Sequence, residues 1–265
     1  MFNIKKQKAF SLMELIAVMA IMAIMAGTLA PSIFNQIKRA KADAEIQNLK
    51  TIMQSLSLYI QDKKVIPTSS TISWTQAIAT VSNISIQKIE FNDNDFRRRL
   101  IFDPQFLTNV DSSFSGVTQN QGLAVEPVSP RVMIISNLTA NVASVANNSS
   151  VFNDIWQQNT SALIKESADI KIERINLKSI FHRIVLSNAN STQASYQLES
   201  GSVISVPAAS GGDGIIIRWV IDQSKISLYS APVSGTSVLQ QTSILQSDWT
   251  SRYQTNGTIW FWGQP

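Results

Sequence analysis

Residues 10–36 read FSLMELIAVMAIMAIMAGTLAPSIFNQ, and this stretch decides the fold. Its side chains are apolar except for a few small polar groups and one carboxylate, that of Glu14. As a helix it would reach about 40 Å, which exceeds the roughly 30 Å hydrocarbon core of a bilayer. An unpaired carboxylate in hydrocarbon costs at least about 2–3 kcal/mol, so Glu14 indicates a functional position.

The residues before this stretch include three lysines and no acid: Lys5, Lys6 and Lys8. Such a leader favours a cytoplasmic N-terminus and export of the rest of the chain, although a second basic cluster at residues 38–41 opposes this bias. The competing interpretation is a secretory signal cut after Thr28-Leu29-Ala30. Pro31 would then follow the cut, and the apolar run is long for such a signal. We therefore expect the helix to be retained.

The order of residues around position 10 resembles the N-terminal signature of type IV pilins and type II secretion pseudopilins. A basic leader and a small residue, Ala9, are followed by Phe-Ser-Leu-Met-Glu (residues 10–14) at the start of an apolar helix. The resemblance implies that a prepilin peptidase removes residues 1–9 by cutting between Ala9 and Phe10, and that Phe10 is then N-methylated. The family prefers glycine before the cut, so Ala9 is a departure that bears on the rate of processing.

The same resemblance implies a pilin-like α+β fold, with a long N-terminal helix packed on an antiparallel β-rich domain. The helix would span about residues 10–62 and be kinked near Pro31, with residues 10–36 in the membrane or filament core. The implied partners are the prepilin peptidase, other pilin or pseudopilin subunits, an inner-membrane assembly platform and the lipid bilayer. The implied location is the bacterial inner membrane, single-pass with the C-terminal domain outside the cytoplasm, and later a pilus or pseudopilus.

The chemistry of the processed N-terminus is consistent with this resemblance. Cleavage would leave a free ammonium on Phe10 one helical turn from Glu14, a spacing at which the two charges partly neutralise each other. In a bundle, Glu14 of one subunit would meet the Phe10 ammonium of its neighbour and fix the axial register of the helices. A buried ion pair is better evidence for register than for net stability. The competing interpretation is that Glu14 extends to the lipid headgroups.

Gly27 and Pro31 form the predicted helix hinge. Proline cannot donate the hydrogen bond to the carbonyl of Gly27 and clashes with it, so the helix is expected to bend or loosen there. An ordinary kink at the membrane edge is the simpler alternative. After the hinge, residues 37–67 carry apolar side chains at three- and four-residue steps among charged ones, which predicts an amphipathic continuation that needs a cover. It should end near Asp62, because Val-Ile-Pro (residues 65–67) cannot continue it.

Residues 68–265 are expected to form one β-rich head domain. Helices are predicted from Trp74 to Val81, capped by Ser73, and from near Val151. The predicted strands are Ile84–Phe91, Leu100–Phe102, Arg131–Ser136, Ile180–Ser187, Ala194–Leu198, Gly214–Ile221, Lys225–Tyr229 and Gly257–Trp262. The clearest hairpin signal is Asp222-Gln223-Ser224, between two of these strands.

Composition argues against several functions. Removing the leader lowers the formal net charge from +4 to +1, because three lysines and no acids leave with it. The one compact basic cluster, Arg97-Arg98-Arg99, is interpreted as a solvated face, so a nucleic-acid partner is not expected. The chain has no cysteine, so an exported domain must rely on its core or on calcium. The single histidine, His182, lies in a predicted strand, and without cysteine a zinc site is not expected.

We therefore predict no catalytic residues, no cofactor, no metal site and no enzyme activity. Asp93-Asn94-Asp95 resembles the start of a calcium loop but lacks the glycine and closing glutamate, and a turn explains it equally well. The predicted function is structural, as a subunit of a type IV pilus or type II secretion-like pseudopilus, with the chain length favouring a minor subunit. The alternative is a binding module displayed at a filament tip as an adhesin, DNA receptor or receptor for a secreted substrate. An exposed aromatic groove around Trp260 and Trp262 would favour that alternative.

Overall fold

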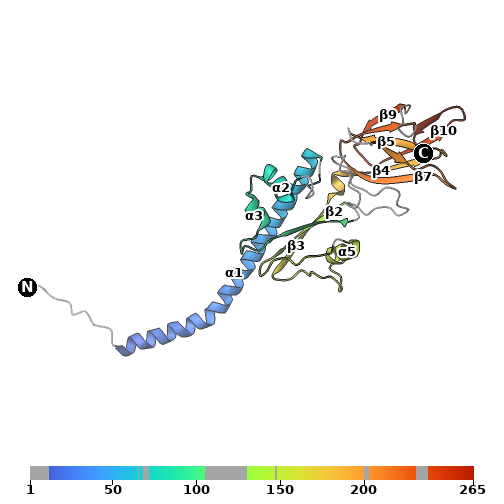
Figure 1. The fold of residues 1–265 in the computed structure, drawn as a ribbon. Helices are drawn as coiled ribbons and strands as arrows, with labels where there is room; N and C mark the ends of the chain where they lie inside the picture. Colours follow the sequence, from blue (N-terminus) through green and yellow to red (C-terminus); the bar gives the residue numbers. More distant parts are fainter. Residues whose placement is uncertain are drawn as a thin grey trace, which may run out of the picture. The chain divides into compact units, whose positions relative to one another are not determined.

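The computed structural model describes most of the chain. The described residues are 12–64, 66–67, 72–104, 130–146, 148–199, 203–230 and 238–265. The chain divides into two compact units, Met1–Ala44 and Glu45–Pro265, and each is described by itself. The arrangement is α+β, as predicted: a long N-terminal helix is followed by a C-terminal part rich in antiparallel sheet (Figure 1).

The long helix α1 runs from Leu12 to Lys63, 52 residues, with Pro31 inside it. In the first unit its large apolar side chains are exposed, for example Met13 at 76% and Ile24 at 69%. By length and composition this helix can cross a membrane. An apolar surface of this kind needs lipid or other protein around it. The bend predicted near Pro31 stays a prediction, because α1 is assigned as one helix through that residue.

In the second unit α1 becomes amphipathic, as predicted. Leu49, Ile52, Met53, Leu56 and Ile60 are almost fully buried, and they recur at steps of three and four residues. The helix ends at Lys63, one residue beyond the predicted Asp62. Lys64 then adopts a left-handed conformation (φ 52°), and its N–H donates to the carbonyl of Ile60 at 2.9 Å, which caps the helix.

A three-stranded antiparallel sheet packs on this part of α1. Its order is β1 (Arg99–Phe102), β2 (Arg131–Asn137) and β3 (Ile170–Asn176). Alternate residues of β2 enter two different cores: Val132 and Ile134 join α1, whereas Met133 and Ile135 join helix α5 (Ser149–Gln157). Helices therefore cover both faces of the sheet (Figure 1), which explains why β2 is apolar at consecutive positions.

Two short helices connect α1 to β1. Helix α2 (Trp74–Ser82) is confirmed, with Ser73 as its N-cap and a reciprocal capping box formed with Gln76. The prediction of a strand at Ile84–Phe91 was wrong, because residues 86–90 form helix α3 (Ile86–Glu90). The single fully buried side chain of α3, Ile89, packs into the core around α1. Tertiary burial of one isoleucine therefore overrides the local alternation of apolar residues.

A buried ion pair ties α1 to the turn after α3. Arg98 Nε lies 2.6 Å from Glu45 Oε1 and Arg98 Nη2 lies 2.7 Å from Glu45 Oε2, and the two side chains are 1% and 3% exposed. Arg98 Nη1 also donates to the carbonyls of Lys88, Ile89 and Phe91. The interpretation of the three arginines as a solvated face was therefore wrong for Arg98.

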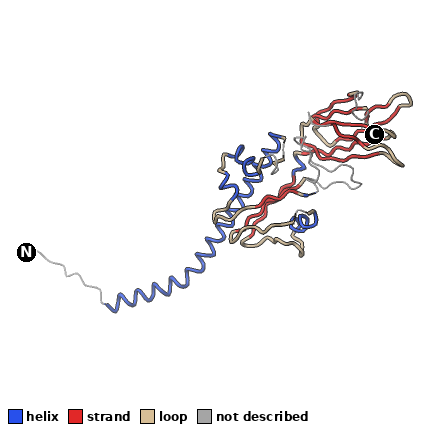
Figure 2. Tube along the Cα trace, in the orientation of Figure 1, coloured by secondary structure: helices blue, strands red, loops and turns tan. Residues whose placement is uncertain are grey.

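The remaining strands form two four-stranded sheets that face each other as a sandwich. One sheet has the order β11-β10-β4-β7 and the other β6-β5-β8-β9 (Figure 2). The strands are β4 (Phe181–Asn188), β5 (Ala194–Leu198), β6 (Val203–Val206), β7 (Gly214–Ile221), β8 (Lys225–Tyr229), β9 (Leu239–Ile244), β10 (Trp249–Thr255) and β11 (Trp260–Gly263). Only the β4–β10 pair is parallel among the described strands. The two sheets contact each other along their edges, where β6 meets β7 and β9 meets β11.

The hairpin predicted at residues 222–224 was wrong, although both of its strands exist. Strand β7 pairs with β4, and β8 pairs with β5 and β9, so the turn crosses from one sheet to the other. The N–H of Asp222 donates to the carbonyl of Ile180, and that of Gln223 donates to the carbonyl of Leu245. The turn residues are thus held by the two different sheets. The turn residues in the sequence do not indicate which strands β7 and β8 pair with.

The sandwich is joined to the helix–sheet part by a shared core. Phe181, Trp219 and Ile221 belong to the same buried cluster as Leu56 and Ile60 of α1. At the end of α1, Lys64 Nζ donates to the carbonyl of Gln223 at 2.6 Å and lies 3.5 Å from Glu199 Oε1.

Breaking the Glu45–Arg98 pair should destabilise the head strongly. Replacing Glu45 by Gln leaves a buried guanidinium without its carboxylate, and we expect a loss of about 3–5 kcal/mol in the free energy of unfolding. Chemical denaturation followed by circular dichroism measures this loss. Arg97→Met is the matched control: Arg97 pairs with Glu90 at the surface, 67% exposed, and its loss should cost less than about 1 kcal/mol. Equal effects of the two substitutions would contradict the role given to the buried pair.

Candidate functional site

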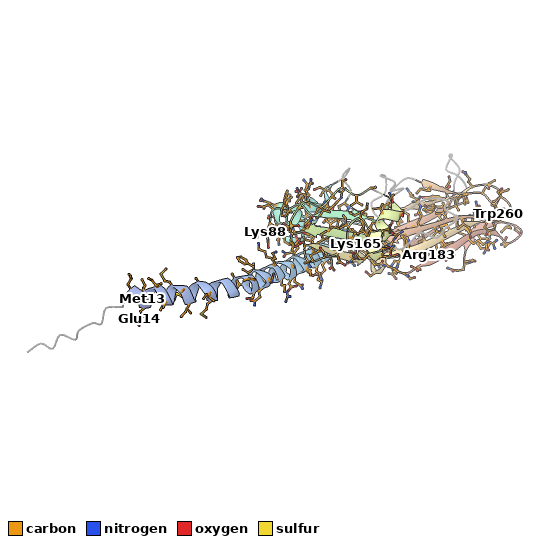
Figure 3. The ribbon with its side chains drawn as sticks, turned by 90° about the horizontal axis from the view of Figure 1, so that it is seen from below. Met13, Glu14, Lys88, Lys165, Arg183 and Trp260 are labelled. Atoms are coloured by element: carbon orange, nitrogen blue, oxygen red, sulfur yellow. The ribbon has the colours of Figure 1, made fainter. Side chains whose placement is uncertain are left out.

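The candidate site is the apolar part of α1 around Glu14. Glu14 is exposed in the first turn of the helix, and it is the only charged residue from Leu12 to Gln36. Figure 3 shows Met13 and Glu14 at the start of the described helix. Met13 and Leu15, its chain neighbours, are 76% and 53% exposed. A lone carboxylate therefore lies within an exposed apolar surface.

The first turn of a helix suits a carboxylate in electrostatic terms. Its free N–H groups and the helix dipole favour negative charge there, typically by about 0.3–1 kcal/mol. This gain is smaller than the cost of placing a carboxylate in hydrocarbon, which is at least about 2–3 kcal/mol. Glu14 therefore needs a positive partner if the segment enters a membrane or a bundle. The predicted cleavage and methylation residues, Ala9 and Phe10, lie outside the described residues, so this pairing stays a prediction.

The predicted hinge residues lie inside α1. Pro31 supplies no N–H to the carbonyl of Gly27, which removes one hydrogen bond of the helix. A Cβ added at Gly27 would meet nothing within 4 Å, so packing within the described chain does not require glycine there. A glycine that packing does not require weakens a helix by about 0.8–1 kcal/mol relative to alanine. Both residues thus lower the local stability of the helix.

The described residues hold no group of three or more His, Asp or Glu side chains that could bind a metal ion. In the segment that resembles a calcium loop, Asp93 and Asp95 are exposed. Asn92 organises this turn: its Oδ1 accepts from the N–H groups of Asn94 and Phe96, each at 3.0 Å, and its Nδ2 donates to Ser136 Oγ. The segment therefore acts as an Asn-capped turn between α3 and β1.

His182 on β4 pairs with Asp222 in the turn after β7. The distance from Nε2 to Oδ1 is 2.8 Å. Burial works to raise the pKa of Asp222, but hydrogen bonds from His182 and Gln223 outweigh it, so this pKa lies below its ordinary value. The pair joins β4 to the turn that links the two sheets of the sandwich.

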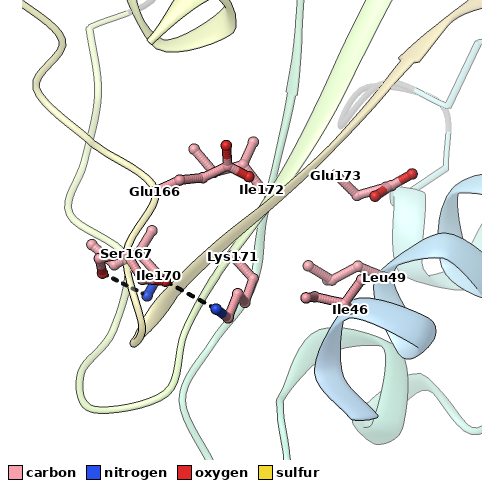
Figure 4. A pocket seen from close by; sticks show the side chains of 8 residues that line it. All are labelled: Ile46, Leu49, Glu166, Ser167, Ile170, Lys171, Ile172 and Glu173. Carbon is pink, nitrogen blue, oxygen red and sulfur yellow. Dashed lines mark hydrogen bonds between the residues drawn. The ribbon is translucent and has the colours of Figure 1, made fainter. Parts of the chain in front are cut away.

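A groove of about 310 Å³ lies between α1 and β3 (Figure 4). Its apolar floor includes Ile46 and Leu49 of α1. Two of its charged groups have partners nearby: Lys171 Nζ donates to the carbonyl of Ser167 at 2.9 Å, and Glu166 lies 3.2 Å from Arg174. Strand β3 is at the end of its sheet, so the groove follows a strand edge. Its lining has no histidine, and therefore no serine–histidine pair for acid–base chemistry.

The aromatic groove that would favour a binding module is not formed by Trp260 and Trp262. Trp262 is 6% exposed, and its indole N–H donates to the carbonyl of Tyr229 at 3.0 Å. Trp260 is half-buried, and its ring centroid lies 5.5 Å from that of Tyr253. The Trp-Phe-Trp alternation of β11 points both indoles into the sandwich core. These tryptophans therefore stabilise the fold.

Sequence reasoning missed Glu45, which anchors α1 to the head. A signal for it was present, because Glu45 lies four residues before Leu49 on the apolar stripe of α1. A carboxylate on a buried stripe predicts a buried basic partner. The sequence does not indicate which of the three consecutive arginines, Arg97, Arg98 or Arg99, provides it.

Comparison with known proteins identifies the N-terminal segment. Residues 4–30 match a family model described as the prokaryotic N-terminal methylation motif, the prepilin signature of type IV pilins and pseudopilins. No curated protein and no solved structure matches the chain. The motif implies processing by a prepilin peptidase and assembly with other pilin subunits, and it indicates a structural subunit. Together with the apolar helix, it fits membrane anchoring.

The lowered pKa of Asp222 predicts how stability depends on pH. The folded state favours the carboxylate, so the contribution of Asp222 is present above the ordinary carboxyl pKa of about 3.9 and is lost as the pH falls through the lowered value. Asp222→Asn should therefore be less stable than wild type at pH 6, with the gap closing towards pH 3. Unfolding free energies measured across this range test the sign. His182→Gln should reduce this pH-dependent component, because it removes the imidazole and leaves the hydrogen bonds from Gln223. A gap that widens at low pH would contradict the assignment.

Proposed function

We propose that this chain is a structural subunit of a type IV pilus or type II secretion-like pseudopilus. It is made as a membrane-anchored precursor, cut between Ala9 and Phe10, N-methylated on Phe10 and assembled through its N-terminal helix. The observation that carries this proposal is the methylation motif at residues 4–30, which opens a helix with an exposed apolar surface and one carboxylate.

The precursor is anchored before it is trimmed. The basic leader stays in the cytoplasm of a bacterial cell, α1 crosses the inner membrane, and the head faces the other side. The exposed apolar side chains of α1 are then surrounded by lipid tails. Prepilin peptidase reaches the Ala9–Phe10 bond at the cytoplasmic edge of the membrane, and an inner-membrane platform receives the processed subunit.

Assembly exchanges lipid for neighbouring helices. Both environments are apolar, so burial of apolar area gives little net preference between them, and packing and polar contacts must decide. Glu14 supplies the polar contact by pairing with the Phe10 ammonium of the next subunit. Two charges in a low-dielectric bundle attract strongly only at one axial offset, so the pair sets the register. Gly27 and Pro31 let the helix adjust as it leaves the membrane.

The head does not depend on disulfides for its stability. The chain has no cysteine, and three buried clusters stabilise the described part of the head. Trp262 is buried and Trp260 half-buried against the sandwich core, so they do not form the exposed aromatic groove that would have favoured a tip-displayed binding module. We therefore propose the structural role alone.

Processing can be tested by intact-mass analysis of the protein isolated from membranes of a strain that carries the prepilin peptidase. The expected product lacks residues 1–9 and carries one methyl group on Phe10. Ala9→Gly should be processed at least as fast as wild type, because the family prefers glycine there, whereas Ala9→Leu should accumulate as precursor. A product that begins at Pro31, or a full-length chain, would exclude this processing route.

Assembly can be tested separately with Glu14→Ala. The processed protein should still reach the membrane, but its incorporation into sheared filaments or pseudopili should fall at least about tenfold, because the register-setting contact is lost. Immunoblots of filament and membrane fractions measure the ratio. Asp43→Ala removes another exposed acid of α1 and should assemble normally. Normal incorporation of processed Glu14→Ala would contradict the pairing proposed for Glu14.

A further inference from the structure

The sandwich contains a buried guanidinium that none of the described residues neutralises. Arg218 on β7 is 2% exposed, and its Nε and Nη1 have no hydrogen-bond partner among the described residues. It lies on the inner face of its sheet: its same-face neighbours Ile216 and Val220 and its cross-strand partner Ile184 are fully buried apolar residues. Its guanidinium lies over the ring of Tyr196 on the opposite sheet, with 5.5 Å from the guanidinium carbon to the ring centroid.

The acidic residues of the sandwich segment, residues 181–265, all have partners other than Arg218. Residues 181–265 contain four acidic residues: Glu199, Asp213, Asp222 and Asp248. Each has another partner. Glu199 accepts from the N–H of Lys225, Asp213 pairs with Arg252, Asp222 pairs with His182, and Asp248 accepts from the N–H of Arg183. The charge of Arg218 therefore calls for an anion from outside this segment.

The energetic cost of burying a charge supports the need for an anion at Arg218. An arginine stays protonated at every pH at which proteins fold, so Arg218 cannot escape the cost of burial by losing its charge. The cost of burying one such ion exceeds what a desolvated cation–π contact with Tyr196 returns. Orphaned buried donors of this kind indicate a bound water or ion. Water satisfies the donors but leaves the charge unpaired.

We propose that Arg218 forms an anion site between the two sheets of the sandwich and that the site takes a small carboxylate of about the size of acetate. The planar guanidinium presents its N–H groups as a fork that matches the two oxygens of a carboxylate. The apolar side chains around Arg218 suit the short hydrocarbon part of such an acid. Strand β7 is an edge strand of its sheet, and it contacts β6, an edge strand of the other sheet. The site therefore lies near the side of the sandwich where these two strands meet. This site is independent of the assembly role of α1.

The test is thermal unfolding of the full-length chain in detergent micelles, with sodium acetate titrated against sodium chloride at equal ionic strength. For wild type, acetate should raise the Tm in a saturable way beyond the effect of chloride, because a ligand that binds only the folded state stabilises it. Arg218→Met should show the same Tm in both salts. Arg252→Met, which removes an arginine paired with Asp213 at the surface, should respond to acetate as wild type does.

A direct readout keeps the proposal testable if Arg218→Met does not fold. Saturation transfer from the protein to the methyl protons of acetate should be seen for wild type. It should require at least about tenfold more acetate for Arg218→Lys, which keeps the charge but loses the planar fork. Equal Tm values in acetate and chloride for wild type, or equal responses in wild type and Arg218→Met, would show that water alone satisfies Arg218 and would overturn the proposal.

Discussion

The exposed apolar surface in the first part of α1 is the constraint on which the rest of the molecule depends. Side chains such as Met13 and Ile24 have no cover within the first unit, so this segment must lie in lipid or against other subunits. Glu14 adds a second requirement, because purely apolar surroundings would leave its carboxylate without a partner of opposite charge. The methylation motif at residues 4–30 overlaps this exposed apolar segment.

The second part of α1 differs from the first, because its apolar side chains are buried against the head of the same chain. Its stripe of buried residues meets a sheet on one side, and Glu45 meets Arg98 at the edge of that contact. Arg98 also holds three carbonyls near α3, so one guanidinium joins the helix, the turn and the start of β1. A buried pair of this kind specifies one arrangement more than it adds net stability. Within the second unit, Glu45 and Arg98 therefore fix how the second part of α1 packs against the residues around α3.

Sequence patterns predicted the parts of the fold that depend on local periodicity. The long helix, the Ser73-capped helix and several strands of strong β-branched character were predicted. Strands β3 and β6 were missed, although IKIERIN and VISV are also rich in β-branched residues. Strands β9 and β10 could not be predicted, because LQQTSI and WTSRYQT are polar and owe their form to neighbouring strands. The false hairpin at residues 222–224 has the same origin, since strand pairing between sheets is decided by tertiary packing. In the candidate site, Glu14 stood out because a charge in an apolar run is rare. Glu45 did not stand out, because its partner is distant in sequence.

Glu14 and Arg218, far apart in the chain, share one property. Each is a charge in apolar surroundings with no partner of opposite charge among the described residues near it. Glu45 and Arg98 show how this chain handles such a charge when it supplies both partners, with two short hydrogen bonds and almost complete burial. By that standard an unpaired charge requires a partner from elsewhere. The partner proposed for Glu14 is a free amine, and the partner proposed for Arg218 is a carboxylate. The two proposals differ in consequence, because an amine from another copy would link one subunit to the next, whereas a small anion would fill a single site.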